Sequence, residues 1–439
     1  MIALDPFGHP PGAHRRLWTA PITLWYCIWQ WLQPRHTLEA VVADARRGGA
    51  DALSEDPEDP LSTGLHSKAT TSFSDARQRL PLAWVRDCFA KMAASLASLA
   101  APPPSDLPIQ LLDGSTKRLR PHGDMPLHFP QHRTRRKRSY WCVARILVSF
   151  CAHTGLAMGA LLASLHVSEQ ALAVQLMLGA ARRVLYIGDR NFGVWRVVRA
   201  ATQSGGHALV RLTKVRARRL FGRKRLPGFL DRPTFWAPSV QDQVDPGLTS
   251  GAVEGRLLVV KTARPGHRPR VLYLFTTLTD PVAYPPERLL EMYGWRWRVE
   301  LNFRTVKTTL QMDQSEAKSA EMVRKEFYAG LMAYNLVRGL MGLAAEQAGC
   351  EPSQLSFSKA QVLLAQWVAE VFLGWMSAPL RLCRLEWLLA EVAAARLPRR
   401  KKPRPNEPRA QYYKPAVFPK MRGSRTEERR ALEKSLMKS

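Results

Sequence analysis

The chain has 439 residues, which is room for two to four domains and a large hydrophobic core. Its 46% hydrophobic content is ordinary for a globular protein, but 65 Lys and Arg against 36 Asp and Glu give a formal net charge of +29. An excess of this size, spread through the chain, indicates a polyanionic partner and favours nucleic acid over an anionic membrane.

Cysteine use and the two long apolar stretches bear on where the protein works. The six cysteines are widely scattered, without a CxxC spacing or a Cys/His cluster that would indicate zinc or a disulfide framework. Residues 17–32 end without a small-residue cleavage site, and residues 141–167 contain Arg145 and His153. We therefore predict a cytoplasmic protein without a signal peptide or a membrane span.

The N-terminal region is predicted to be helical. Residues 17–32 read as a packed helix, and apolar residues then recur at helical spacing over 73–80 and 82–96, with Pro81 between the two runs. Such a pair of short helices could dock on DNA, or could simply cap the domain that follows. The prolines at 102–104 mark the boundary.

Two predicted strands each deliver an aspartate at their carboxyl end. Residues 108–112 form a short apolar run that closes on Asp113, and residues 183–187 form another that closes on Asp189. Between them lie two β-like runs and a helix that Ser168 can cap. This order of strands and helices indicates an α/β core, although many acids in such positions only cap turns.

A long interval separates Asp189 from the next candidate acid. It contains a strongly basic stretch at 214–219 that continues to 225, then a turn region rich in Pro and Asp, and β-like runs at 253–262 and 270–278. We interpret residues 214–283 as a β-rich insertion, basic on one side, that interrupts the core.

The segment that follows is predicted to be one helix with two unlike faces. It opens at Pro286, and at about 3.6 residues per turn Tyr293, Arg296, Glu300 and Lys307 share one face, opposite an apolar stripe. A carboxylate among Arg, Lys and Tyr suggests a site for a metal ion and a phosphate. A solvated helix face with intrahelical ion pairs is the ordinary alternative.

Three carboxylates from two strand ends and a helix would suit magnesium or manganese, which take oxygen ligands and leave positions for phosphate and water. Two such ions about 3.5–4 Å apart can assist an in-line phosphodiester displacement. Combined with the basic charge, the three acids favour phosphoryl transfer on nucleic acid over a solvated helix face. Further helices are expected at 322–343, 357–374 and 379–396, and residues 397–439 are expected to be an extended or disordered basic tail.

The spacing Tyr293-x2-Arg296-x3-Glu300-x6-Lys307 resembles the Tyr-Arg-Glu-Lys signature of bacterial insertion-sequence transposases of the IS-four family. LLDGSTKRL around Asp113 and YIGDRNFG around Asp189 resemble the first and second acidic motifs of that family. The likeness runs from about residue 70 to 345.

The resemblance implies an α/β fold with a ribonuclease-H-like (RNase-H-like) catalytic core. The implied regions are a helical one at 1–105, the core at 106–213 and 284–345 with the β-rich insertion 214–283 between, and a helical region with a basic tail at 346–439.

The resemblance also implies a DDE transposase that cuts the ends of its element and joins them to target DNA. Asp113, Asp189 and Glu300 would hold two Mg²⁺ ions, with Mn²⁺ as a substitute, and Tyr293, Arg296 and Lys307 would grip DNA. The partners would be double-stranded DNA and a second copy of the chain, in the bacterial cytoplasm at the nucleoid. Some relatives form a DNA hairpin with a base stacked on a tryptophan of the insertion. Trp236 is the candidate in the insertion and Trp195 lies before it, but packing in the core is the ordinary alternative for both.

Two other functions remain open from the sequence. A transposase-derived protein could bind DNA without cutting it, since intact acids do not prove a competent site. A general nuclease on the same core would cut without preference for the ends of an element.

Overall fold

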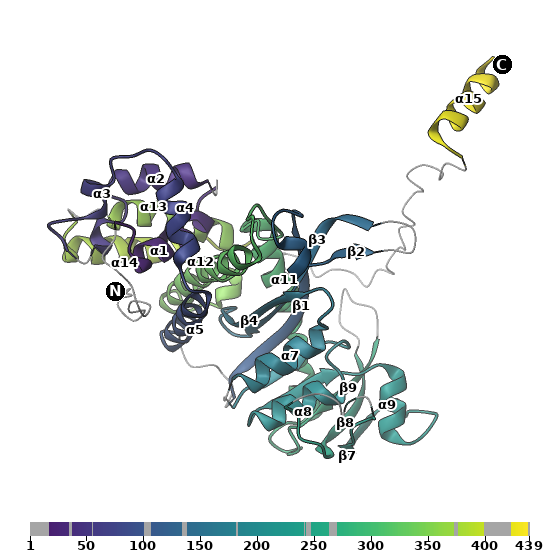
Figure 1. The fold of residues 1–439 in the computed structure, drawn as a ribbon. Coiled ribbons are helices and arrows are strands. Elements are labelled where there is room, and N and C mark those ends of the chain that lie inside the picture. Colours follow the sequence, from purple (N-terminus) through teal and green to yellow (C-terminus); the bar gives the residue numbers. More distant parts are fainter. Residues whose placement is uncertain are drawn as a thin grey trace. The chain divides into compact units, whose positions relative to one another are not determined.

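The computed structural model describes residues 17–34, 37–54, 56–100, 107–133, 138–180, 183–240, 242, 247–262, 270–372, 376–398 and 423–437. The chain divides into a large unit, residues 1–261 and 271–399, and a small unit, residues 262–270 and 400–439. The large unit is a mixed α/β structure built on one ten-stranded sheet (Figure 1). In the described part of the chain no helix is long and apolar enough to cross a membrane.

The centre of the sheet positions the candidate site. Its strands are β1 (Ile109–Leu119), β3 (Arg138–Cys151), β4 (Ala157–Ser164), β5 (Leu185–Gly188) and β6 (His207–Arg211). They run in the order β4-β3-β1-β5-β6, with antiparallel pairing from β4 to β1 and parallel pairing from β1 to β6. The first residues of β1 pair with β5, and its last two residues pair with β10 (Gln314–Ser315).

Each face of this sheet packs on different helices, because successive strand residues point to opposite faces. Leu112 packs among residues of α7 (Glu169–Leu178) and α8 (Trp195–Gln203), which are the connections before β5 and before β6. Its neighbour Leu111 belongs to the larger core on the other face. Ser168 caps α7 as the sequence predicts, since its hydroxyl accepts from the Ala171 amide.

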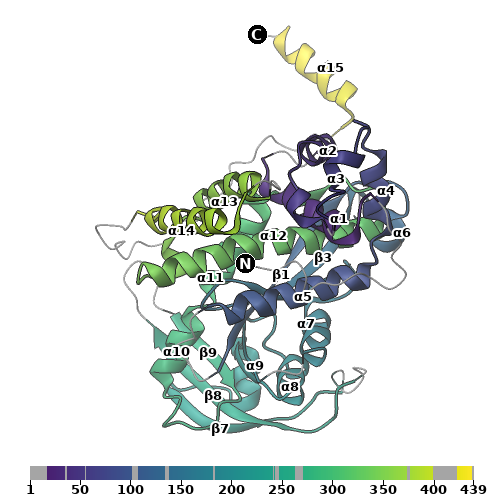
Figure 2. The ribbon, with the colours of Figure 1, turned by 90° about the vertical axis from the view of Figure 1, so that its left-hand side faces the viewer.

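The larger core is organised around α12 (Ala320–Gln347), a long helix that packs against α1 (Ala20–Leu32), α5 (Leu82–Ser98) and α14 (Ala378–Ala394) (Figure 2). Pro81 separates α4 (Thr71–Arg79) from α5, as predicted. The same core includes residues of α2 (Leu38–Arg46), α3 (Leu61–Gly64) and α13 (Phe357–Val371). Short elements complete the unit: η2 (Asp51–Leu53), α6 (Met125–His128), β2 (Gln131–Arg133) and η5 (Pro352–Gln354).

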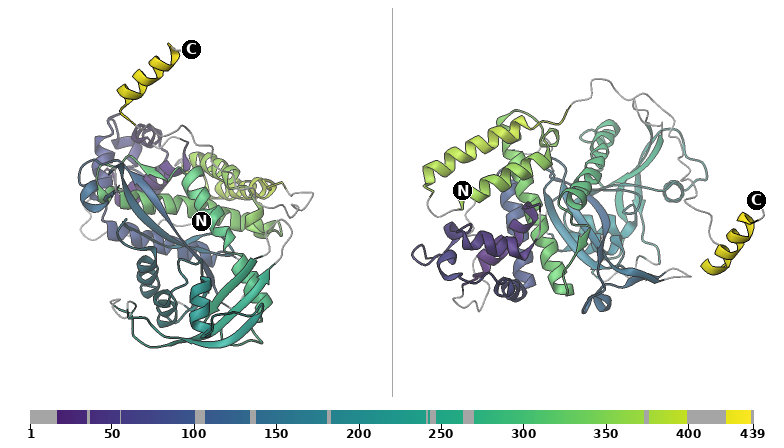
Figure 3. Two further views of the ribbon diagram at one scale, coloured as in Figure 1. Left: turned by 90° about the vertical axis from the view of Figure 1, so that its right-hand side faces the viewer. Right: turned by 90° about the horizontal axis from the view of Figure 1, so that it is seen from above.

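The region predicted as a β-rich insertion extends the same sheet. β9 (Arg270–Thr276) pairs antiparallel with β6, and the order continues through β8 (Val253–Thr262) to β7 (Leu230–Trp236) (Figure 3). The basic stretch begins with a helix, α9 (Lys214–Phe221), which the sequence reading did not predict. The proposed division into domains stays a prediction.

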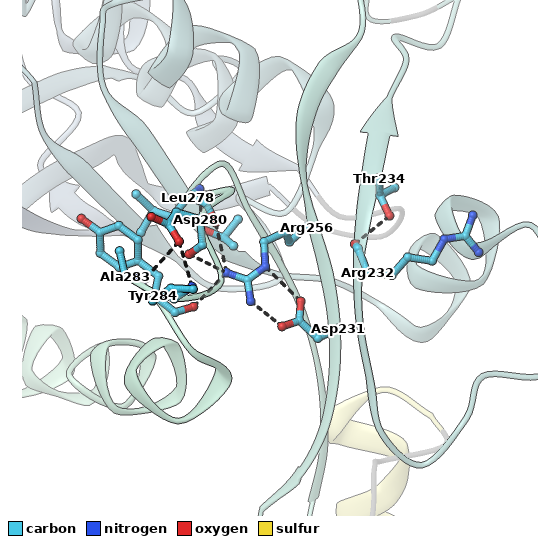
Figure 4. Close-up of polar contacts among 10 residues, drawn as sticks. Asp231, Arg232, Thr234, Arg256, Leu278, Asp280, Ala283 and Tyr284 are labelled. Atoms are coloured by element: carbon cyan, nitrogen blue, oxygen red, sulfur yellow. Dashed lines mark hydrogen bonds and ion pairs between the residues drawn. The ribbon is translucent and has the colours of Figure 1, made fainter.

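Arg256 fastens this extension to the segment that leads toward the candidate site (Figure 4). Its side chain, only 2% exposed, forms an ion pair with Asp231 on β7. The same guanidinium donates to the carbonyl oxygens of Leu278, Asp280 and Tyr284, the last at 2.8 Å. Strand β8 is therefore tied to residues 278–284, directly before the next helix.

The prediction of one continuous helix through Lys307 is wrong. The structure has α10 (Pro286–Gly294), a tighter turn in which the Trp295 and Arg296 amides bond to carbonyls three residues back, and α11 (Trp297–Arg304). A π-helical turn, η4 (Thr305–Thr309), follows and carries Lys307. Side-chain spacing along this segment therefore departs from 3.6 residues per turn at two points.

The C-terminal part was expected to be extended or disordered, and this is wrong for one segment. Residues Arg425–Leu436 form a helix, α15, in the small unit. Within the expected tail, residues 399–422 and 438–439 lie outside the described residues.

Candidate active site on neighbouring strands

Asp113 and Asp189 lie on the neighbouring strands β1 and β5, just beyond the residues that pair these strands with each other. Asp189 follows the last residue of β5, as predicted. The prediction that a strand ends at residue 112 is wrong, because β1 continues through Asp113 to Leu119 in its pairing with β3. In the parallel register Leu111 is opposite Ile187, so each aspartate comes two residues after a paired position. The Gly114 amide donates to Asp113 Oδ1 at 2.9 Å, and the Asn191 amide donates to Asp189 Oδ1 at 2.7 Å. The structure therefore brings these two predicted residues together.

The surroundings of Asp113 disfavour the charged form of its carboxyl group. Burial raises the pKa of Asp113 to about 6, with the negative charges of Asp189 and Glu169 adding to the shift, while the Gly114 amide and Arg296 oppose it. Like charges raise a carboxyl pKa only over a short distance. Carboxylates that repel one another in this way are stabilised by a bound cation, so the cluster has the charge that a cation site requires.

Glu300 faces the same region from α11 but is held by Arg296. Its Oε1 accepts from the Arg296 guanidinium at 3.0 Å, and its side chain is 47% exposed. Burial would lower the pKa of Arg296, but Tyr293, Glu300 and Asp189 together raise it. Arg296 thus lies among the three predicted acids and links Glu300 to Asp113 and Asp189.

Tyr293 and Lys307 reach the same charges in spite of the interrupted helix. Tyr293 is 6% exposed, and burial raises the pKa of its hydroxyl although Arg296 opposes the shift. Burial lowers the pKa of Lys307, which the carboxylates of Asp313 and Asp113 partly offset. Lys307 is therefore close to Asp113, while the Tyr293 ring belongs to the core.

Glu169, at the start of α7, is a fourth carboxylate that the sequence reading missed. Its Oε2 accepts from Asn191 Nδ2 at 2.6 Å, and Arg145 forms an ion pair with it at 3.5 Å. Burial raises the pKa of Glu169, and Arg145 opposes that shift. In the sequence an acid after Ser168 reads as an ordinary first-turn helix residue.

The chemistry of the donors fits a hard divalent cation, because Asp113, Asp189 and Glu300 all offer carboxylate oxygens. The geometry is not that of a preformed site: among the described residues, no three His, Cys, Asp or Glu side chains are grouped as they would be around one ion. Glu300 would have to turn from Arg296 to complete the set.

Three comparisons with known proteins bear on this site. The model of the transposase DDE domain family matches residues 104–336, which include all the predicted site residues. The transposase InsG for insertion sequence element IS4, from Escherichia coli (strain K12), is 29% identical over 298 residues. That match covers 66% of this chain and 66% of the relative.

Among solved structures, a cryo-EM structure of the piggyBac transposase synaptic complex with hairpin DNA matches 88% of this chain and 80% of its own, at 11% identity and a TM-score of 0.41. The family model covers more than half of the sequence and includes the motifs around Asp113, Asp189 and Glu300. The resemblance drawn from the sequence is confirmed: the chain belongs to the family of transposases with a DDE domain.

Proposed function

We propose that the protein catalyses cut-and-paste transposition of an insertion sequence, by cleaving DNA at the ends of the element and joining those ends to target DNA. The observation that carries the proposal is that Asp113 and Asp189 lie on the adjacent strands β1 and β5, close enough for their charges to interact, with Arg296 acting on both and bonded to Glu300. Family membership supports the same chemistry.

The sheet order supports an RNase-H-like core. Three antiparallel strands, β4, β3 and β1, are followed by the parallel strands β5 and β6, with α7 and α8 as the connections. In this arrangement Asp113 in β1 and Asp189 directly after β5 lie on neighbouring inner strands of the sheet, and α11 approaches β1. We propose Asp113, Asp189 and Glu300 as the ligands of two Mg²⁺ ions, for which Mn²⁺ could substitute.

Divalent ions, when bound, would stabilise the charge that develops on the attacking and leaving oxygens. The chain's own groups would do the rest. Arg296 and Lys307 would bind phosphates beside the carboxylates, and Arg296 would release Glu300 as it does so. Tyr293, buried next to Arg296, would orient that guanidinium rather than contact DNA through an exposed ring.

The proposed partners are double-stranded DNA, as element ends and as target, and a second copy of the chain in a synaptic complex. A net charge of +29 supports the first of these. The proposed location is the bacterial cytoplasm, at the nucleoid.

The test uses the full-length protein, Mg²⁺ and duplex DNA that carries the ends of the element next to this reading frame. Wild-type protein should nick and join these ends, and Glu300→Ala should lose both activities while binding the ends normally. Normal end binding by wild-type protein without any cleavage would instead favour a DNA-binding protein that no longer cuts. Cleavage without preference for the ends would favour a general nuclease.

A further inference from the structure

Glu169 bridges the two chain segments that carry the paired aspartates. On one side its carboxylate accepts from Asn191 Nδ2 at 2.6 Å, and the Asn191 amide in turn donates to Asp189. The neighbouring Gln170 also donates to the Asn191 carbonyl, at 2.8 Å. The first turn of α7 therefore holds the loop that presents Asp189.

On the other side the carboxyl group of Glu169 lies over Gly114, directly after Asp113. A Cβ atom at Gly114 would come within 2.3 Å of Glu169 Cδ and 2.6 Å of Oε1, far inside van der Waals contact. Gly114 lies in β1 with no positive φ, so the strand conformation does not itself require glycine. The missing side chain is what leaves room for Glu169.

Neither helix capping nor charge pairing at the surface accounts for this placement. Ser168 already caps α7, and the Glu169 side chain is only 21% exposed. It points across the first turn to β1 and to the Asp189 loop, with Arg145 as its counter-charge.

We infer that Glu169 is a positioning residue of the metal site: through Asn191 it holds the Asp189 loop against the strand that presents Asp113. The inference rests on the proposed function, since it assigns Glu169 a part in the same site. Groups that orient metal ligands typically contribute 10–100-fold to metal affinity.

The test measures Mn²⁺ binding by electron paramagnetic resonance to the full-length protein on end DNA, together with the Mg²⁺ dependence of end cleavage. Glu169→Ala should weaken Mn²⁺ binding by about 10-fold or more and raise the Mg²⁺ requirement in parallel. Glu169→Gln keeps an oxygen acceptor for Asn191 and should retain most of the wild-type affinity. Glu321→Ala is the matched control, because Glu321 is also a first-turn acid in an ion pair, here with Lys325 on α12.

Gly114→Ala provides a second, independent arm. Alone it should displace Glu169 and weaken Mn²⁺ binding, and in the Glu169→Ala background it should have no further effect, since the displaced group is already gone. Additive effects of the two changes, or wild-type Mn²⁺ affinity in Glu169→Ala, would overturn the inference. An equal loss of Mn²⁺ affinity in Glu169→Gln and Glu169→Ala would also overturn the inference, because it would indicate that the charged carboxylate of Glu169 binds the metal ion itself. Wild-type protein that neither binds Mn²⁺ nor cuts DNA would overturn the proposed function itself, and the inference with it.

Discussion

Lys117 is a buried base in the strand that carries Asp113. Its side chain is 1% exposed, and Nζ donates to the Met312 carbonyl at 2.8 Å. Burial lowers the pKa of Lys117 to about 8, although the carboxylates of Glu326 and Asp313 oppose the shift. In the unfolded chain the pKa of a lysine is about 10.4. Between about pH 8 and 10.4 the unfolded chain therefore holds a proton that the folded protein has released, so the free energy of unfolding rises with pH.

Lys117→Met should remove this pH dependence. Relative to the variant, wild-type protein should gain stability from about pH 8 upward, by about 3 kcal/mol over the whole window, and no further relative change is expected below about pH 8. Urea unfolding at a series of pH values checks this, with Lys359→Met, at an exposed position on α13, as a control that should follow wild type. A variant whose stability rises with pH as steeply as that of wild type would show that Lys117 stays charged when folded.

At the candidate site, the sequence indicated the acids that follow strands or lie in a family motif. Asp113 and Asp189 each follow an apolar run, so their approach on neighbouring strands follows from the parallel pairing of those runs, although β1 continues past Asp113 to Leu119. Glu169 could not be recognised in the same way. Its place over Gly114 depends on how α7 crosses the sheet after β4, and no local pattern encodes that crossing.

At the scale of elements, the interrupted α10–α11 segment brings Lys307 toward Asp113. The π-helical turn carries Lys307, whose charge interacts with Asp113 and which we propose as a phosphate-binding residue. Lys307→Ala should therefore weaken end binding and lower the slope of log affinity against log salt by about one phosphate contact. Fluorescence anisotropy with end DNA over a range of salt concentrations measures this, and Lys359→Ala serves as the exposed control. An unchanged salt slope would remove Lys307 from the DNA interface.

Arg256, which ties β8 to Asp231 and to residues 278–284, should contribute more to the free energy of unfolding than nearby surface residues do. Arg256→Met would leave Asp231 without its ion pair and would remove the donor that three carbonyl oxygens share (Figure 4). Breaking a buried pair by removing one partner costs about 3–5 kcal/mol, so we expect a loss of about 3 kcal/mol in urea unfolding. Arg288→Met removes a more exposed bond to the Ala283 carbonyl in the same segment and should cost below about 1 kcal/mol. Equal losses in the free energy of unfolding for the two variants would show that Arg256 does not fasten β8 to residues 278–284.

The elements that the sequence failed to predict have local physical reasons. β7 contains Pro233 and reads as a turn region, but β7 is the last strand of the sheet, and an edge strand tolerates a residue without an amide donor. The break between α10 and α11 contains no proline from which it could be predicted. It consists of hydrogen bonds three residues apart around Trp295 and Arg296, within a segment whose apolar side packs on the core.

At the scale of the whole molecule, the sequence could not show that the predicted insertion continues the core sheet. The pairing of β6 with β9 joins Leu209 to Thr276, far apart along the chain, and such a pairing follows from the packing of the entire unit. The β-like runs at 253–262 and 270–278 predicted these two strands without identifying their partner. Net charge, by contrast, depends only on composition, so the value of +29 could be interpreted directly as a sign of a polyanionic partner.

The last prediction concerns how that charge is divided along the chain. Residues 400–439 carry thirteen Lys and Arg against four Asp and Glu, and eight of these basic residues with one acid lie in 400–422. Deleting 400–439 should leave the thermal unfolding of the large unit unchanged, because α15 lies in the small unit. The same deletion should weaken binding to a non-specific duplex and flatten its salt dependence, by a slope of about 0.9 for each phosphate that the shortened chain no longer neutralises.

Deleting only 423–439, which carries five basic and three acidic residues, is the matched control and should change the salt slope far less. The difference is expected because the net positive charge of the C-terminal part lies mainly before residue 423, and the salt slope follows the number of phosphates that basic side chains neutralise. A large effect of the shorter deletion would assign the DNA interaction to α15 instead. A lowered unfolding temperature after the longer deletion would show that residues 400–439 help to stabilise the large unit.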